Sequence, residues 1–292
     1  MCKTANAKTD TPMQTTRRQF IQWGLGCLAT MALSPGWAAP ANAIPIGFQL
    51  FTVRGELARD VPGTLSTLAQ IGYQGVEFWD YAGTPNVYQK HSAADLRKLL
   101  DARRLRCCGM HVKLEALSGE NLKRTIANSH VLGNEYINLV MAPEKMKSEA
   151  GITELAALLN QVSAQCREEK LVVGYHCHGF DFAEVNGQFP WDLLFRQAKP
   201  EVNMQLDVGN CLSGGGDPIA ILKEFPGRAR TVHLKEYQEK TFDSAFYQEV
   251  FRLCETPRAP KWYIVEMGSA DGTGFDVPRQ ALATLRRLGK QP

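Results

Sequence analysis

Features that define several large classes of protein are missing from this sequence. No apolar run is long enough to cross a bilayer as a helix, which takes about 20 consecutive apolar residues. The formal net charge is only +3, no block of like charges occurs, and no basic stripe is interleaved with aromatic residues. We therefore expect no stable membrane anchor and no nucleic-acid partner.

Cysteine pairs with metal-binding spacing are missing as well. The chain has eight cysteines, but none of them forms a CxxC pair or another zinc-like spacing. Six of the eight follow residue 43, namely Cys107, Cys108, Cys166, Cys177, Cys211 and Cys254. Several of these lie in apolar runs, where a free cysteine behaves as a small hydrophobic residue. A disulfide stays open at this point, because spacing alone does not pair the cysteines.

The first 43 residues have the features of an export signal. Residues 16–21 read TRRQFI, a twin-arginine pattern, and a short apolar stretch over 23–33 leads to the small residues of 41–43 (ANA), an A-x-A cleavage site. We interpret residues 1–43 as a removed twin-arginine (Tat) signal peptide, which implies the Tat export machinery as a partner and a periplasmic location. The alternative is a chance Arg-Arg pair in front of an N-terminal anchor.

From Ile44 onward, short apolar runs alternate with longer amphipathic ones. The predicted strands are 46–51, 75–79, 106–112, 136–140, 171–176, 202–207, 229–235 and 262–266, and the predicted helices are 61–71, 92–103, 120–132, 153–168, 191–197, 218–225, 244–254 and 278–288. Eight βα units in about 250 residues predict an α/β protein in which 44–292 form a single (β/α)8 TIM barrel. An open doubly wound sheet is the alternative, but it would carry a glycine-rich phosphate turn where residues 51–54 read FTVR.

Polar side chains gather at the carboxyl ends of the predicted strands, where the active site of such a barrel lies. In chain order they are Gln49 and Arg54, Glu77, His111, Asn138, His176 and His178, Asp207 and Asn210, His233 and Lys235, and Glu266. Polar groups buried elsewhere along the strands would cost free energy without a benefit. We therefore expect these side chains to surround one site at the mouth of the barrel.

Four of these residues, on the last four strands, form a candidate metal site. His176, Asp207, His233 and Glu266 supply two imidazoles and two carboxylates. Mixed nitrogen and oxygen ligands suit Mn²⁺, Zn²⁺, Co²⁺ or Fe²⁺. Each residue also has an ordinary explanation; Asp207, for example, could cap a turn, and Glu266 could pair with Lys235. We predict that the four together bind one divalent metal ion.

Two histidines compete for the same position in this metal site. Strand alternation places His176 and His178 on the same side of the chain, whereas Cys177 between them points toward the core. His176 lies nearer the strand, so we favour it as the ligand and expect His178 to face the substrate.

The motifs at these strand ends resemble the xylose isomerase-like barrel superfamily, in its sugar phosphate isomerase/epimerase branch. The matching segments are 47–54 (GFQLFTVR), 72–77 (GYQGVE), 174–182 (GYHCHGFDF), 206–210 (LDVGN), 215–218 (GGDP), 232–235 (VHLK) and 265–266 (VE). The resemblance covers the whole mature chain and implies one divalent metal held by the four groups above. It implies a small-molecule sugar or keto-sugar substrate, and we assign Gln49, Arg54, Glu77, His111, Asn138, Asp181 and Asn210 to substrate binding. Association into a homo-oligomer stays open.

This sequence departs from the family pattern at two positions of the site. Epimerases of the superfamily pair a glutamate on the fifth strand with one on the eighth, whereas the fifth strand here offers His176. Asp181 replaces the usual glutamate of the fifth-strand signature. The first departure argues against a symmetric epimerisation by two carboxylates, and the second implies rearranged sugar contacts.

The resemblance implies proton abstraction next to a metal-bound carbonyl of the sugar, with Glu266 or His178 as the base and Lys235 neutralising the oxyanion. Reprotonation then gives a sugar isomerase or epimerase, which is our preferred interpretation. Elimination on the same metal site, as in a 3-keto-glycoside lyase or dehydratase, is a serious alternative. A non-catalytic sugar-binding protein is less favoured. Phosphodiester hydrolysis, as in the related apurinic endonucleases, is the least favoured because surplus metal ligands and a basic surface are missing.

Overall fold

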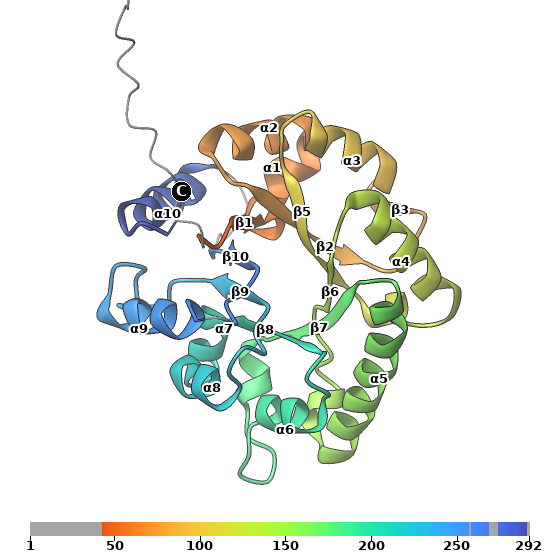
Figure 1. The fold of residues 1–292 in the computed structure, drawn as a ribbon, viewed down its shortest axis with the longest axis vertical. Coiled ribbons are helices and arrows are strands. Elements are labelled where there is room, and N and C mark those ends of the chain that lie inside the picture. The colour runs from red at the N-terminus through yellow and green to blue at the C-terminus, as the bar shows by residue number, and fades with distance from the viewer. Residues whose placement is uncertain (1–42, 257, 269–273, 291–292) are drawn as a thin grey trace, which may run out of the picture. The chain divides into compact units, whose positions relative to one another are not determined.

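Eight parallel strands close into a barrel in the computed structural model, which describes residues 43–256, 258–268 and 274–290. The strands follow one another around the barrel as β1, β10, β9, β8, β7, β6, β5 and β2 (Figure 1). Their bounds are β1 Ile46–Gln49, β2 Gly75–Tyr81, β5 Arg106–Val112, β6 Tyr136–Leu139, β7 Val172–His176, β8 Asn203–Asp207, β9 Thr231–Leu234 and β10 Trp262–Val265. The predicted α/β fold, a (β/α)8 TIM barrel, is confirmed.

Helices connect the strands and cover the outside of the barrel (Figure 1). The longer ones are α2 Val61–Ile71, α3 Ala93–Asp101, α4 Gly119–Leu132, α5 Glu149–Glu168, α6 Pro190–Gln197, α8 Pro218–Glu224, α9 Ala245–Cys254 and α10 Asp276–Arg287. Local capping explains several of their ends: Ser92 and Asp95 form a capping box at the start of α3, and Gly133 ends α4 in the left-handed conformation. These helices bury their apolar faces against strands that are themselves almost fully buried.

Some elements differ from the sequence prediction. The helix α5 begins at Glu149, four residues before the predicted start, because Ser148 caps it through the backbone N–H of Gly151. Short elements were not predicted at all, namely α1 Arg54–Arg59, α7 Val208–Ser213, the hairpin of β3 Asn86–Tyr88 with β4 His91–Ser92, and the 3₁₀ turns. These segments are too short for hydrophobic periodicity to reveal them.

The structure also bears on three expectations from the sequence, which concern disulfides, membrane-spanning helices and the export signal. All six cysteines after residue 43 are free and buried, so no disulfide forms among them in the structure. Within the described part of the chain, no helix is both long enough and apolar enough to cross a membrane. The predicted export signal, residues 1–43, lies outside the described residues except for Ala43, and export stays a prediction.

Candidate metal centre and substrate cavity

A cavity of about 600 Å³ opens at the carboxyl ends of the strands. Its lining divides into a polar group, a rim of charged residues and an apolar group. The polar group is Gln49, His111, His176, His178 and Glu266; the rim is Asp80, Lys113 and Glu115; the apolar group is Phe51, Trp79, Leu114, Val140 and Met141. The cavity therefore lies where the sequence places the active site, and it includes several of the predicted residues.

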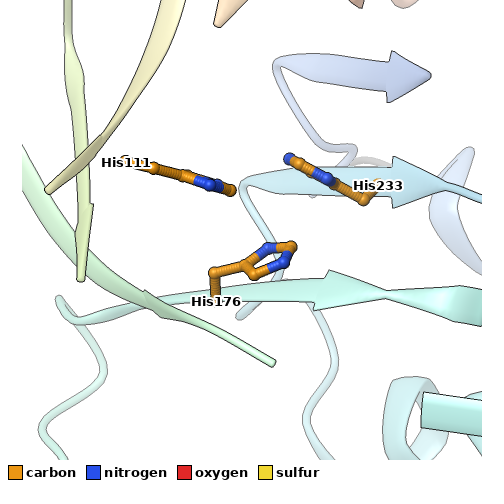
Figure 2. A group of neighbouring side chains, drawn as sticks. All are labelled: His111, His176 and His233. Atoms are coloured by element: carbon orange, nitrogen blue, oxygen red, sulfur yellow. The ribbon is translucent and has the colours of Figure 1, made fainter. Parts of the chain in front are cut away.

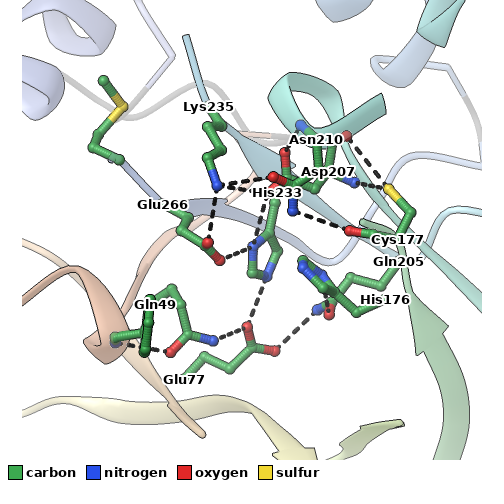
Figure 3. A network of polar contacts seen from close by, with 12 residues as sticks. Gln49, Glu77, His176, Cys177, Gln205, Asp207, Asn210, His233, Lys235 and Glu266 are labelled. Carbon is green, nitrogen blue, oxygen red and sulfur yellow. Dashed lines mark hydrogen bonds and ion pairs between the residues drawn. The ribbon is translucent and has the colours of Figure 1, made fainter. Parts of the chain in front are cut away.

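The four predicted metal ligands lie together at the base of this cavity. His176, Asp207, His233 and Glu266 each offer one ligand atom, and these atoms all lie within 4.8 Å of one another (Figure 3). The strand register explains the convergence, because Asp207 on β8 is directly opposite His233 on β9. All four residues are buried. The geometry is thus that of a site able to hold one cation.

Asp207 uses its two carboxylate oxygens differently. Its Oδ1 accepts a hydrogen bond of 2.7 Å from the backbone N–H of Asn210 and so caps α7. Its Oδ2 is buried and has no hydrogen-bond partner among the described residues. Burial raises the pKa of Asp207 to about 6. This oxygen lies 3.9 Å from both His233 Nδ1 and Lys235 Nζ, beyond hydrogen-bond distance. A buried carboxylate oxygen without a hydrogen bond is costly, and a cation beside it would remove that cost.

The orientation of His176 leaves one ring nitrogen available to a metal. Nδ1 lies 3.1 Å from the amide oxygen Oε1 of Gln205. This oxygen can accept but not donate, so Nδ1 carries the proton and Nε2 carries the lone pair. Burial, together with the nearby His111 and His233, holds the pKa of His176 well below its usual range. The ring is therefore neutral, as a metal ligand must be.

His233 lies between two carboxylates. Its Nε2 is 2.7 Å from Oε2 of Glu77, and its Nδ1 is 3.0 Å from Oε2 of Glu266. Burial alone would lower the pKa of His233, but the two carboxylates raise it to about 10. In a metal-bound protein Nε2–H would still donate to Glu77, while Nδ1 would face the cation. Glu77 and His233 would then form the carboxylate–histidine–metal arrangement that orients a ligand ring.

Glu77 is the centre of the polar network beneath the site (Figure 3). Besides His233, it accepts hydrogen bonds from Gln49 Nε2 at 2.8 Å and from Gln205 Nε2 at 2.9 Å, and His111 Nε2 is 3.1 Å away. Burial would raise the pKa of Glu77, but the two histidines lower it well below its ordinary range. Glu77 is fully buried and does not line the cavity, so its place is that of a residue that orients others.

Three histidine rings meet at the base of the cavity (Figure 2). The ring of His111 lies 4.4 Å from that of His176 and 5.3 Å from that of His233 between centroids. These three also form a group with ligand atoms close enough to share an ion. However, His111 Nε2 is already 2.7 Å from Oε1 of Gln205 and Nδ1 is 3.3 Å from Gln49 Nε2. The set with Asp207 and Glu266, by contrast, includes the Oδ2 of Asp207, which accepts no hydrogen bond from the described residues.

The three residues predicted to act in catalysis surround the same point. The Nδ1 atom of His178 is buried without a hydrogen-bond partner in the described structure, and burial lowers the pKa of His178 to about 4. Lys235 Nζ lies 3.2 Å from Oε1 of Glu266 and 2.9 Å from Oδ1 of Asn210. Burial opposes the charges of Lys235 and Glu266, but Asp207 and Glu266 raise the pKa of the lysine, and His233 and Lys235 lower that of the glutamate. At neutral pH the site thus presents a neutral imidazole beside an ion pair.

The predicted substrate-binding residues divide into two groups. Gln49 and His111 line the cavity, whereas Arg54, Glu77, Asn138, Asp181 and Asn210 are not part of its lining. Asn138 lies deeper in the barrel, where its Oδ1 accepts from Asn203. Asp181 accepts from the hydroxyl of Tyr175 and from the backbone N–H of His178, so it fixes the loop that carries His178. Arg54 stacks its guanidinium over the ring of Phe51, 4.5 Å from the centroid.

Two groups of residues near the site were not predicted. Gln205 and Asn203 alternate with Asp207 along β8, so three inward-facing polar residues at every second position were a signal for them. The apolar residues of the cavity carry no comparable signal, because all except Trp79 on β2 lie in 3₁₀ turns or loops beyond the strand ends.

Comparison with known proteins agrees with the fold. The model of the family described as "Xylose isomerase-like TIM barrel" matches residues 65–288. The chain belongs to this family. A sugar phosphate isomerase/epimerase from Parabacteroides distasonis has a similar structure, with a TM-score of 0.73 and 21% identity over 90% of this chain and 99% of that one. The structure of the IOLI protein with a bound zinc atom has a TM-score of 0.59 and 13% identity, over 85% of this chain and 99% of that one.

One curated relative is named for a different reaction, a dehydration. It is an inosose dehydratase from Clostridium tetani (strain Massachusetts / E88), 30% identical over 87 residues. The match spans 30% of this chain and 28% of the dehydratase, so the chain covers less than a third of that relative.

Proposed function

We propose that this protein is a divalent-metal-dependent enzyme that removes a proton next to a carbonyl group of a sugar or keto-sugar. The observation that carries the proposal is the convergence of His176, Asp207, His233 and Glu266, with the proton-accepting His178 beside them in one cavity. The names of similar proteins, a sugar phosphate isomerase/epimerase and an inosose dehydratase, support a sugar or polyol substrate.

The donor set fits a transition-metal ion. Two imidazoles and two carboxylates suit Mn²⁺, Zn²⁺, Co²⁺ or Fe²⁺, and the Oδ2 of Asp207, which accepts no hydrogen bond from the described residues, is an oxygen that such an ion would engage. When bound, the ion supplies electrophilic stabilisation of the negative charge that develops on the carbonyl oxygen. The zinc reported for the IOLI protein supports this choice of ion class.

Side chains of the protein would carry out the proton transfer and stabilise the negative charge. His178 is neutral and lines the cavity, so its ring can accept the proton. The ammonium group of Lys235 stabilises negative charge at the site, and Asn210 holds it in place through a bond of 2.9 Å. Glu266, which also lines the cavity, is the alternative group that can accept or return a proton.

Two outcomes follow from the same proton abstraction. Return of the proton to the neighbouring carbon gives isomerisation, and return to the opposite face gives epimerisation; this is the outcome we put first. Elimination is the second candidate: the electron pair of the broken C–H bond forms a C=C bond to the adjacent carbon, the C–O bond of that carbon breaks, and the leaving oxygen takes up the proton from the protonated base. The presence of His176 at the end of β7 and of His178 just beyond it, in place of a second glutamate, favours elimination over symmetric epimerisation.

An isotope experiment tests the proposal and separates the outcomes. Purified mature protein is loaded with each candidate metal and incubated with sugars and 3-keto-glycosides in D₂O. We expect deuterium at the carbon next to the carbonyl, with release of an aglycone if elimination occurs. The variant His178→Gln should lose the exchange, whereas His130→Gln, a half-exposed histidine on α4, should keep it. Bound metal without solvent exchange in any substrate would refute the proposal.

We also propose that the enzyme works in the periplasm after Tat export. The support is the sequence of residues 1–43, and N-terminal sequencing of the protein from a periplasmic fraction tests it. Cleavage after Ala43 is the expected result, whereas an intact N-terminus in the cytoplasmic fraction contradicts the proposal.

A further inference from the structure

One wall of the cavity is apolar and faces solvent. Five large hydrophobic residues are exposed in the described part of the chain, and three of them, Phe51, Leu114 and Met141, line this cavity. Their exposed fractions are 43%, 37% and 42%. Exposed apolar side chains that gather at a cavity mark a binding surface, because leaving them in water is unfavourable. We call Phe51, Trp79, Leu114, Val140 and Met141 the apolar wall.

The apolar wall is held in place by packing behind it. The ring of Phe51 meets that of Trp79 edge to face at a centroid distance of 5.8 Å, and Trp79 packs on Tyr88 at 5.1 Å. Trp79 belongs to β2 and Tyr88 to β3, so the hairpin β3–β4 supports the wall. A preformed aromatic surface of this kind binds an apolar partner without the cost of ordering itself.

The cavity is larger than a single sugar ring requires. Its volume of about 600 Å³ falls within the range of roughly 300–1,000 Å³ typical of pockets for drug-sized ligands. The four candidate metal ligands lie at the ends of β7 to β10, whereas the apolar wall lies at the ends of β1, β2, β5 and β6, on the other half of the barrel. On the rim, the ammonium of Lys113 is paired with Asp80 at 2.8 Å, which leaves it poorly placed to bind a phosphate group.

We propose that the substrate is a glycoside of a keto-sugar, whose apolar or aromatic aglycone lies on the apolar wall while its sugar ring faces the metal centre. This inference rests on the proposed function and names its substrate class. A free sugar or a sugar phosphate would leave the apolar wall in water, whereas an aromatic aglycone would cover it.

The experiment compares two substrates that differ in the aglycone alone. We measure kcat/KM for a methyl and a 4-nitrophenyl 3-keto-glucoside, following deuterium incorporation and aglycone release. The wild type should prefer the aryl glycoside by at least about tenfold, in line with burial of one aromatic ring. Phe51→Ser and Met141→Ser should lose most of this preference and retain activity on the methyl glycoside. Both side chains are exposed, so neither change threatens the fold.

The matched control is Val131→Ser, which alters an equally exposed apolar residue on α4 away from the cavity. It should leave the preference unchanged. Equal kcat/KM for both glycosides, or faster turnover of a free or phosphorylated sugar, would overturn the inference about the aglycone.

A binding measurement keeps the two proposals separate. If no substrate reacts, the proposed function fails, and calorimetry with methyl and 4-nitrophenyl β-glucopyranoside then tests the apolar wall by itself. Tighter binding of the aryl compound that is lost in Phe51→Ser supports the wall as an aglycone site, and equal binding refutes it.

Discussion

At the scale of single residues, Asp207 links the fold to the proposed metal chemistry. Its Oδ1 caps α7, and its Oδ2 is left for a cation. Asparagine is as good a helix cap as aspartate, but it lacks the charge. We therefore expect Asp207→Asn to lower the affinity for the divalent metal by at least about tenfold to a hundredfold. That is the loss seen when a residue that only hydrogen-bonds to a metal ligand is replaced, and here a charged ligand itself is lost. Calorimetric titration of the metal-free protein measures it.

The matched control for this prediction is Asp217→Asn. Asp217 caps α8 in the same way, accepting hydrogen bonds from the backbone N–H groups of Ile219 and Ala220. It should leave metal affinity unchanged. Equal affinities of the wild type and Asp207→Asn would show that Asp207 acts as a cap alone.

The buried carboxyl group of Asp181 leads us to predict that the stability of the protein depends on pH. Burial raises its pKa to about 7, whereas the unfolded chain has a value of about 3.9. Between these values the folded protein keeps a proton that the unfolded chain has released, so the free energy of unfolding falls as the pH rises, by up to about 1.4 kcal/mol per pH unit. Asp181→Asn removes this titration but breaks one of the bonds from Tyr175 and His178. The variant should be the less stable protein at pH 5, and its deficit should shrink by about 1–3 kcal/mol by pH 7.5.

Urea denaturation of the chelator-treated protein at several pH values tests this expectation, with the difference between wild type and variant as the readout. Using the difference cancels the titration of all other groups. A deficit that stays constant or grows between pH 5 and pH 7.5 would show that the Asp181 carboxyl is ionised throughout this range.

At the scale of elements, the approach of β2 to β5 determines where Glu77 lies. Glu77 pairs with Gly109 across the two strands, and a Cβ atom at position 109 would come within 2.1 Å of the Glu77 Oε1. Gly109→Ala must therefore displace Glu77, which orients His233 through a bond of 2.7 Å. We expect a loss of about 1–3 kcal/mol in stability and about tenfold in metal affinity, measured by denaturation and calorimetry.

Gly268→Ala is the control for this change, because a Cβ there meets nothing within 4 Å. It should alter stability by less than about 0.5 kcal/mol and leave metal affinity unchanged. If Gly109→Ala lowers stability but not metal affinity, Glu77 does not orient His233.

Elements with strong local signals could be predicted from the sequence, and the others could not. The helix over Val61–Ile71 and the cap at Ser92 depend on spacing and on side chains a few residues apart, so the sequence contains them. The helix α7, Val208–Ser213, has six residues and includes Gly209, which weakens any helical signal. Its cap, Asp207, was considered as a turn former and is at the same time a metal-ligand candidate.

The candidate site likewise contains residues that the sequence predicts and contacts that it does not. Strand alternation and the barrel rule place His176, His233 and Glu266 at one end of the barrel without any tertiary information. The bond between Gln205 and Glu77 joins residues 128 positions apart and depends on how the strands close into a barrel. No local pattern contains that register, so the sequence predicts Glu77 at a strand end but not its bond to Gln205.

At the scale of the whole molecule, the closed barrel couples metal binding to the free energy of unfolding of the whole domain. The four ligands come from separate strands, β7 to β10, so the site exists in the folded protein and not in the unfolded chain. A ligand present at a hundred times its Kd then adds about 2.7 kcal/mol to the free energy of unfolding, which corresponds to a rise of about 5–10 °C in Tm for a domain of this size. Thermal denaturation with and without the metal measures it.

The same experiment identifies the site responsible. EDTA should reverse the rise in Tm for the wild type, and Asp207→Asn should show little rise at the same metal concentration because it lacks one ligand charge. Mg²⁺ at equal concentration should stabilise less than Zn²⁺ or Mn²⁺, because two imidazole nitrogens match the borderline ions better than a hard cation. A Tm that responds to no divalent ion, or that responds equally in wild type and Asp207→Asn, would mean that these four side chains do not hold a metal ion.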